Sequence, residues 1–285
     1  MNDVKIVTAA SSATAPDETR GSVLVSGSYG GIYNAWHALR RGARAVILND
    51  AGVGKNGAGI SGLAWLDSLG VAGAVTDCWT CHIGDGEHML AHGRISHVNQ
   101  HAAALGCKVG QSAAGCAERM KAARPLDVAL PEIAGGKRFV ISDKPGERRV
   151  LGLDAAPLLE PGDASAIAIT GSHAALFRGR PDNIINVDLF AVFFNDAGVG
   201  LDNAGIRRLT DLEARGIIAA TVSADSAEIG SARSGYDDGV ISHANAIALA
   251  AGIEPGARLR VAVDRIAIKK PSRSDGAPPG PGREG

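Results

Sequence analysis

The hexapeptide NDAGVG stands at residues 49–54 and recurs at residues 195–200, an offset of 146 (195 − 49) in a chain of 285 residues. Upstream, SGS at 26–28 pairs with TGS at 170–172, after a two-residue insertion in the second copy. Downstream, the offset of 146 pairs Ala58 with Ala204, Gly70 with Gly216, Ile83 with Ile229, Gly93 with Gly239, His97 with His243, Asn99 with Asn245 and Gly110 with Gly256. A register held this far is typical of a tandem duplication.

Each copy alternates strand and helix signals, which is typical of parallel α/β layers. Apolar runs at 23–25 and 167–169 end in Gly-Ser, as a buried strand ends in a turn, and a helical stretch at 33–41 follows in the first copy. Strands at 45–48 and 191–194 end in NDAGVG, and a helix–strand unit follows at 58–75 and 204–222. We therefore expect an α/β fold with two pseudo-twofold related halves and mainly parallel sheet.

The remaining segments complete the expected domain organisation. Residues 137–154 carry a Pro-Gly pair between two strand-like runs, which predicts a β-hairpin. The tail is too rich in Pro, Gly and polar residues to bury a core. We expect a strand and a loose segment at 1–20, the first repeat at 21–125, a linker with the hairpin at 126–160, the second repeat at 161–268 and a disordered tail at 269–285.

Charge and composition exclude several classes of partner. The chain has 29 basic and 30 acidic residues and no basic stripe, so we expect no nucleic-acid partner. Its apolar runs are far shorter than the roughly 20 residues of a membrane helix, and the start of the chain does not resemble a secretory signal. We expect a cytoplasmic protein with reduced cysteines, no membrane partner, a small-molecule substrate and assembly into a homo-oligomer.

The Gly-Ser and NDAGVG loops follow strand ends, where ligands bind in open parallel sheets. Their glycines let the backbone approach a ligand closely. The Asp of each hexapeptide is either a general base or the cap of the next helix. Candidate site residues here are Ser28 as nucleophile, Asp50 as base, and Gly27, Tyr29, Asn49, Ser172 and Asp196 as substrate-binding residues.

The motif ISHxN is the second polar block that both copies keep. His97 and His243 precede Ala-rich helical segments, so each is either a structural hydrogen-bonding group or a general acid–base. Ser96 and Ser242 are interpreted as helix caps. We take His97 as a catalytic candidate, and His243 and Asn99 as substrate-binding candidates.

A Cys- and His-rich stretch at 78–97 occurs in the first copy alone. CWTCH has the spacing of a haem attachment site, but no export signal accompanies it. The stretch could also hold zinc or iron through Cys78, Cys81 and histidines such as His88 and His92. The favoured interpretation is a pocket-lining loop in which Cys81 is a candidate nucleophile and His82 contacts the substrate. No cofactor is favoured, and a divalent metal is an alternative.

Two further motifs are considered for nucleotide binding. GVGK at 52–55 lacks the spacing and the Ser/Thr of a phosphate-binding loop. SGSYGGIY at 26–33 with LRRGARAVILND at 39–50 resembles the first strand–helix–strand unit of short-chain dehydrogenases, whose pattern is TGxxxGIG, and FNDAGVG at 194–200 resembles their NNAG stretch. The resemblance implies a nicotinamide cofactor. However, Tyr33 replaces the last glycine, and no tyrosine has a lysine four residues on.

These observations predict an enzyme that acts on a small carboxylate-bearing metabolite. The favoured reaction is hydrolysis of an amide or ester in a crevice lined by the Gly-Ser, NDAG and ISHxN loops, with backbone amides as an oxyanion site. The alternatives are a metal-dependent lyase or hydrolase using residues 78–97, an NAD(P)-dependent oxidoreductase, and a non-catalytic small-molecule binding protein.

Overall fold

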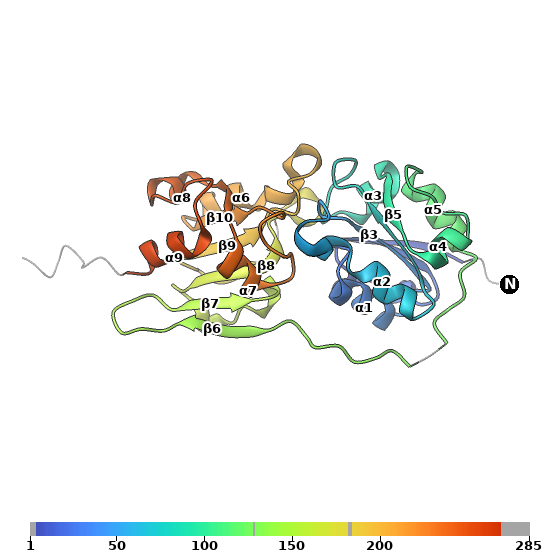
Figure 1. The fold of residues 1–285 in the computed structure, drawn as a ribbon, viewed down its shortest axis with the longest axis horizontal. Coiled ribbons are helices and arrows are strands. Elements are labelled where there is room, and N and C mark those ends of the chain that lie inside the picture. Colours follow the sequence, from blue (N-terminus) through green and yellow to red (C-terminus); the bar gives the residue numbers. More distant parts are fainter. Residues whose placement is uncertain (1–3, 128, 182–183, 269–285) are drawn as a thin grey trace, which may run out of the picture.

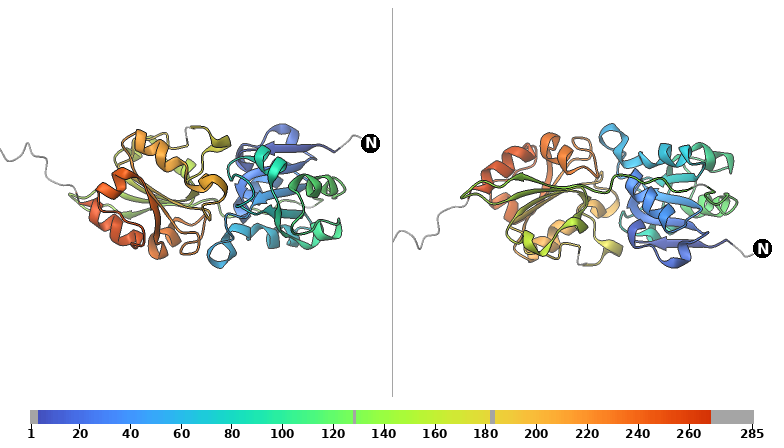
Figure 2. Two further views of the ribbon diagram at one scale, coloured as in Figure 1. Left: turned by 90° about the horizontal axis from the view of Figure 1, so that it is seen from above. Right: turned by 90° about the horizontal axis from the view of Figure 1, so that it is seen from below.

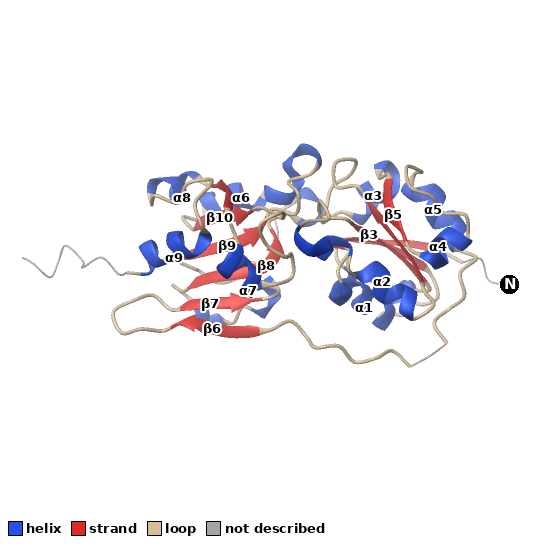
Figure 3. Cartoon of the chain, viewed as in Figure 1, coloured by secondary structure: helices blue, strands red, loops and turns tan. Residues whose placement is uncertain are grey.

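The computed structural model describes residues 4–127, 129–181 and 184–268 and has an α/β fold. Two sheets lie side by side, each flanked by helices (Figures 1 and 3). The segment between the halves runs along one side of the molecule, and Figure 2 gives views from above and below. The prediction of an α/β fold with mainly parallel sheets is confirmed. The predicted tail at 269–285 lies outside the described residues.

The first sheet has the strand order β1-β2-β3-β4-β5. Its strands are parallel except for the antiparallel pair β4 and β5. Their bounds are Ile6–Ala9, Val23–Tyr29, Ala45–Asn49, Ala72–Thr76 and Ile95–Val98.

The second sheet has the order β11-β10-β9-β8-β7-β6. The inner pairs are parallel, and the outer pairs β6–β7 and β10–β11 are antiparallel. The bounds of β6 to β11 are Arg138–Ser142, Val150–Leu153, Ile167–His173, Ala191–Asn195, Ile218–Val222 and Ile241–Ala244. The predicted hairpin is therefore present, and it forms one edge of this sheet.

Helices cover both faces of each sheet. On the first sheet, α1 (Ile32–Arg40) and α2 (Gly62–Ser68) pack on one face, and α3 (Gly86–His92), α4 (Gln100–Ala104) and α5 (Ala113–Met120) pack on the other. On the second sheet, α6 (Arg208–Ala214) lies on one face, and α7 (Ala232–Asp238), α8 (Ala246–Ala250) and α9 (Leu259–Ala267) lie on the other. No helix among the described residues has the length and apolar character needed to span a bilayer.

Burial on both faces explains the continuous apolar runs in the strands. Val23 and Val25 of β2 point into the core under α3 and α5, whereas Leu24 points into the core under α1 and α2. All three side chains are fully buried. A strand covered on both faces needs apolar residues at every position, which is the pattern the sequence shows.

Each sheet includes a strand that lies outside the repeat bounds expected from the sequence. In the first sheet this strand is β1, which lies within the segment 1–20 where the sequence predicts a strand, and it pairs in parallel with β2. Strand β7 occupies the same place beside β8, because Ile6↔Val23 in the first sheet corresponds to Val150↔Ile167 in the second. The two sheets thus share topology and register, while their origin by duplication stays a prediction.

The two hexapeptide loops meet where the halves touch. Residues 51–54 have φ of 49°, 73°, 63° and 67°, and the second loop repeats this with 51°, 73°, 63° and 71°. The Lys55 amide donates to the Ala224 carbonyl at 2.8 Å, and the equivalent Leu201 amide donates to the Cys78 carbonyl at 2.9 Å. The amide that directly follows each left-handed loop therefore bonds a carbonyl of the opposite half.

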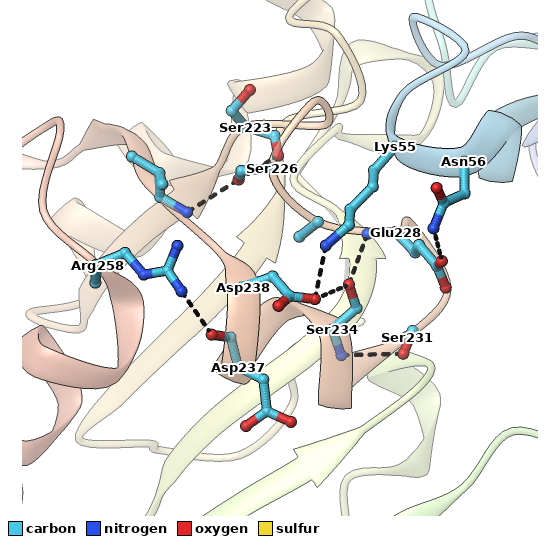
Figure 4. A network of polar contacts seen from close by, with 12 residues as sticks. Lys55, Asn56, Ser223, Ser226, Glu228, Ser231, Ser234, Asp237, Asp238 and Arg258 are labelled. Atoms are coloured by element: carbon cyan, nitrogen blue, oxygen red, sulfur yellow. Dashed lines mark hydrogen bonds and ion pairs between the residues drawn. The ribbon is translucent and has the colours of Figure 1, made fainter.

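Polar side chains extend this contact (Figure 4). Lys55 Nζ lies 2.8 Å from Asp238 of α7, and Asn56 Nδ2 donates to Glu228 at 2.6 Å. At the equivalent positions, His82 Nε2 lies 2.9 Å from Asp202. With the offset of 146, Asn56 corresponds to Asp202 and Glu228 to His82, so the two pairs occupy equivalent positions in the contact between the halves.

Candidate functional site

A cavity of about 220 Å³ lies between the halves, where the carboxyl ends of β2 and β8 meet. The segment 134–136 that connects the halves forms part of its wall. Polar and aromatic residues of both halves line it: Ser28, Tyr29, Tyr33, Asn34 and His37 from the first, and Asp154, Ser172, His173, Phe177 and Arg208 from the second.

The walls come from equivalent positions of the two copies. With the upstream offset of 144, Ser28 corresponds to Ser172, and Tyr29 to His173. Ser28 Oγ accepts the Ser12 amide at 3.0 Å, and Ser172 Oγ accepts the Ala156 amide at 2.9 Å. Each hydroxyl is thus fixed in place by a backbone amide and keeps its own proton for donation.

Tyr29 reaches from β2 to the second half. Its phenol packs on Gly230, where any Cβ would collide with the Tyr29 hydroxyl oxygen. Burial raises the pKa of Tyr29, and the nearby charge of Asp154 raises it further. Tyr29 is therefore a neutral hydrogen-bond donor at physiological pH.

His37 lies on α1 and contacts the edge of the Tyr33 ring, with ring centres 4.5 Å apart. Burial lowers the pKa of His37, and Arg40 and Arg41 lower it further. The imidazole is consequently neutral at pH 7 and able to accept a proton. At pH 7 the cavity thus holds a phenol that keeps its proton and can donate a hydrogen bond, and an imidazole that is unprotonated and can act as a base.

The second half contributes a buried cation and a second imidazole. Arg208 is 2 % exposed, and its Nη2 donates to the Ala175 carbonyl at 2.6 Å. His173 Nδ1 accepts the Ala175 amide at 3.2 Å, which assigns the proton of the neutral ring to Nε2. The Ala175 backbone therefore orients both side chains.

The carboxylates of the NDAGVG loops lie outside the cavity lining. Asp50 Oδ1 accepts the amides of Gly52 and Cys78, each at 3.0 Å. Asp196 Oδ1 accepts those of Gly198 and Ala224, at 3.0 and 2.9 Å. Asn49 likewise accepts the amide of Ala51, at 2.9 Å. The Asn and Asp side chains therefore fix the shape of each hexapeptide loop, and each Asp also ties its loop to the loop that follows the neighbouring strand.

Gly27 supports a backbone contact within the first half. A Cβ at this position would overlap the backbone of Gly84 and Asp85. The Gly84 amide donates to the Gly27 carbonyl at 2.8 Å. Gly27 therefore lets the loop before α3 pack against β2.

The ISHxN motifs form edge strands instead of crevice loops. His97 lies on β5, and its Nδ1 is 3.2 Å from Ser96 Oγ, while His243 lies on β11 beside a surface pocket that includes Asp202 and Glu213. Asn99 and Asn245 cap α4 and α8. The prediction that Ser96 and Ser242 are helix caps is wrong, because both lie within strands and the Asn residues take that place.

The Cys/His-rich stretch divides between core and surface. Cys81 is fully buried, and burial raises the pKa of its thiol to about 11, which leaves little thiolate at neutral pH. His82 bonds Asp202 and stacks on His88, with ring centres 3.8 Å apart. Neither Cys81 nor His82 lines the cavity between the halves.

The geometry also bears on a metal site. Among the described residues, one group of side chains brings ligand atoms within 4.8 Å of one another: Asp50, Asp77 and Cys78. Burial raises the pKa of Cys78, as does the carboxylate of Asp50, so the thiol is protonated and a metal would have to displace its proton. The histidines of α3 do not belong to this group.

Three residues predicted from the sequence, Ser28, Tyr29 and Ser172, line the cavity, whereas its other polar residues are not among the predicted ones. A signal was available, because the offset that aligns SGS with TGS also aligns Tyr29 with His173 and Tyr33 with Phe177. An aromatic or imidazole ring at both positions in both copies indicates a shared ring-lined surface.

The chain matches no protein-family model, no curated protein and no solved structure. Its function is therefore inferred from the site itself.

Proposed function

We propose that this protein is an enzyme that hydrolyses an amide or ester of a small carboxylate-bearing metabolite in the cavity between its halves. The observation that carries the proposal is the lining of one cavity by Tyr29, His37 and Arg208, drawn from both halves. A cavity of about 220 Å³ suits a small metabolite.

The side chains divide the reaction between them. Neutral His37 accepts a proton from water or from the Ser28 hydroxyl, and the oxygen so activated attacks the carbonyl carbon. The Tyr29 phenol donates a hydrogen bond to the carbonyl oxygen as negative charge develops there. The Arg208 guanidinium places a positive charge in the cavity wall, which favours binding of a substrate carboxylate. Water is consumed, and an acid with an alcohol or amine is released.

A substrate panel tests this proposal on the wild-type protein. We expect p-nitrophenyl hemisuccinate, which carries a carboxylate, to be hydrolysed with at least about tenfold higher kcat/KM than p-nitrophenyl butyrate, which does not. Arg208→Gln should raise KM for the hemisuccinate and leave KM for the butyrate unchanged. Equal rates for both esters, or turnover no faster than in buffer, would contradict the proposal.

One observation favours a second candidate, a non-catalytic binding protein. Ser28 and Ser172 make the same bond to a backbone amide on both sides of the cavity, as two structural residues would. A binding protein would show saturable binding of the hemisuccinate product, succinate, by calorimetry without turnover of either ester. This outcome separates the two candidates.

A further inference from the structure

Cys107 and Cys116 lie together in the core of the first half, Cys116 on the buried face of α5, away from the cavity. Cys107 follows α4, and its Sγ lies 3.6 Å from the Cys116 carbonyl oxygen. The Cys116 side chain lowers the pKa of Cys107, and the Cys107 side chain raises that of Cys116, as expected of close neighbours. Both belong to the core between the first sheet and its helices, with exposures of 3 % and 0 %.

In the second half, the positions equivalent to the two cysteines carry apolar side chains. With the offset of 146, Cys107, Gln111 and Cys116 correspond to Ile253, Ala257 and Ala262. Ile253 and Ala262 are buried in the equivalent core. Apolar side chains are therefore sufficient for packing here, and the first half instead carries two thiols and an amide.

Polar groups around the thiols favour a thiolate on Cys107. The neighbouring Cys116 side chain lowers the pKa of Cys107 against the opposing effect of burial, and the charge of Arg119 lowers it further. The Arg119 guanidinium lies beside the turn that precedes Cys107, because a Cβ on Gly106 would be 3.1 Å from Arg119 Nη1. Gln111 Nε2 is buried and has no hydrogen-bond partner within the described part of the chain. An amide donor without a partner beside two thiols is suited to a sulfenate oxygen.

We propose that Cys107 and Cys116 form a reversible redox pair that a hydroperoxide converts to a disulfide. The Cys107 thiolate attacks one peroxide oxygen, the O–O bond breaks, and Cys107 sulfenic acid and hydroxide form. The Cys116 thiol then attacks the sulfenic sulfur, an S–S bond forms, and the hydroxyl leaves as water with the thiol proton. The peroxide is reduced by two electrons and the two thiols are oxidised. A dithiol reductant reverses the reaction.

The test treats the folded, full-length protein with hydrogen peroxide and follows intact mass and disulfide-linked peptides. We expect loss of two hydrogen atoms, a 107–116 cross-link, and recovery of the original mass with dithiothreitol. In Cys116→Ser the sulfenic acid on Cys107 should persist and add dimedone. The Cys78→Ser/Cys81→Ser variant should respond like the wild type, because those thiols lie outside the pair.

A matched variant carries the second half's own residues, C107I/Q111A/C116A. It should fold with an unchanged circular-dichroism spectrum and lose the response to peroxide. A cross-link that appears only in denaturant, or one that joins Cys78 to Cys81 in the folded protein, would overturn the proposal. So would a folded wild type whose Cys107 reacts no faster than Cys81.

Discussion

Gly52 and Gly198 pack against each other at the contact between the two halves. A Cβ built on either glycine would lie 2.8 Å from the Cα of the other. Both residues have a φ of 73°, within loops that the same hexapeptide builds. A common structural role thus explains the recurrence of NDAGVG, because each loop needs a left-handed glycine at which the opposite loop can approach.

Replacing Gly52 by Ala should destabilise the protein in two ways. The left-handed backbone costs an alanine roughly 1–2 kcal/mol, and overlap with Gly198 adds about 1–3 kcal/mol. Gly70 is the matched control, because it has the same φ of 73° and nothing within 4 Å of a Cβ. Urea unfolding of G52A and G70A separates the two effects, and equal losses of unfolding free energy would refute the close contact.

Neutralising the buried carboxylate of Asp163 should lower the free energy of unfolding strongly. It is fully buried, and its oxygens accept bonds from Arg138 at 2.8 and 3.0 Å and from Arg149 at 2.9 Å. Asp163→Asn leaves both cations facing a neutral amide, so we expect a loss of about 3–5 kcal/mol. Asp188→Asn is the control, since Asp188 is fully exposed 3.7 Å from Arg215 and its replacement should leave the urea midpoint unchanged.

The same carboxylate predicts a dependence of stability on pH. Burial alone would raise the pKa of Asp163, but the hydrogen bonds from Arg138 outweigh it and hold that pKa below its ordinary value. Its stabilising contribution is therefore complete above the unfolded pKa of about 3.9 and is lost as the pH falls through the lower folded pKa. Urea midpoints of wild type and D163N should converge between about pH 5 and pH 2. A constant difference over that range would argue against a lowered pKa.

Removing the Tyr29 hydroxyl should affect turnover more than folding. Tyr29→Phe keeps the ring that packs on Gly230 and removes the donor proposed for the carbonyl oxygen. We expect about 10²–10³-fold lower kcat on p-nitrophenyl hemisuccinate, with unfolding free energy changed by no more than about 1.5 kcal/mol. Tyr236→Phe, on α7 and outside the cavity, should retain the wild-type rate. Similar kcat values in both variants would remove Tyr29 from the mechanism.

Most of the fold could be predicted from the sequence because its strands are buried on both faces. Runs such as Val23–Val25 and Ala191–Phe194 are apolar at every position, and glycines mark where they end. The edge strands of the sheets are harder to predict from the sequence. Strand β5 contains Ser96 and His97, so its half-polar pattern resembles a loop, and only its pairing with β4 identifies it as a strand.

The site could be predicted only in part because it forms where the halves meet. Ser28 and Ser172 follow strand ends in an obvious motif, and strand ends locate ligand crevices. His37 lies in the middle of α1, and Arg208 at the start of α6. Nothing local marks either residue as functional, since their convergence depends on how the two sheets pack together. Asp50, by contrast, stands in a conspicuous sequence motif, but its Oδ1 accepts the amides of Gly52 in its own loop and of Cys78 in the loop after β4.

The most direct measurement compares kcat/KM for p-nitrophenyl hemisuccinate in His37→Gln and His97→Gln, with the exposed His101→Gln as a control for surface histidines. Glutamine keeps the polar side chain but cannot accept a proton at neutral pH. We predict a loss of about 10²–10⁴-fold for His37→Gln alone. If His97→Gln loses the activity and His37→Gln keeps it, the active site lies at the sheet edge and the cavity between the halves is not where the chemistry takes place.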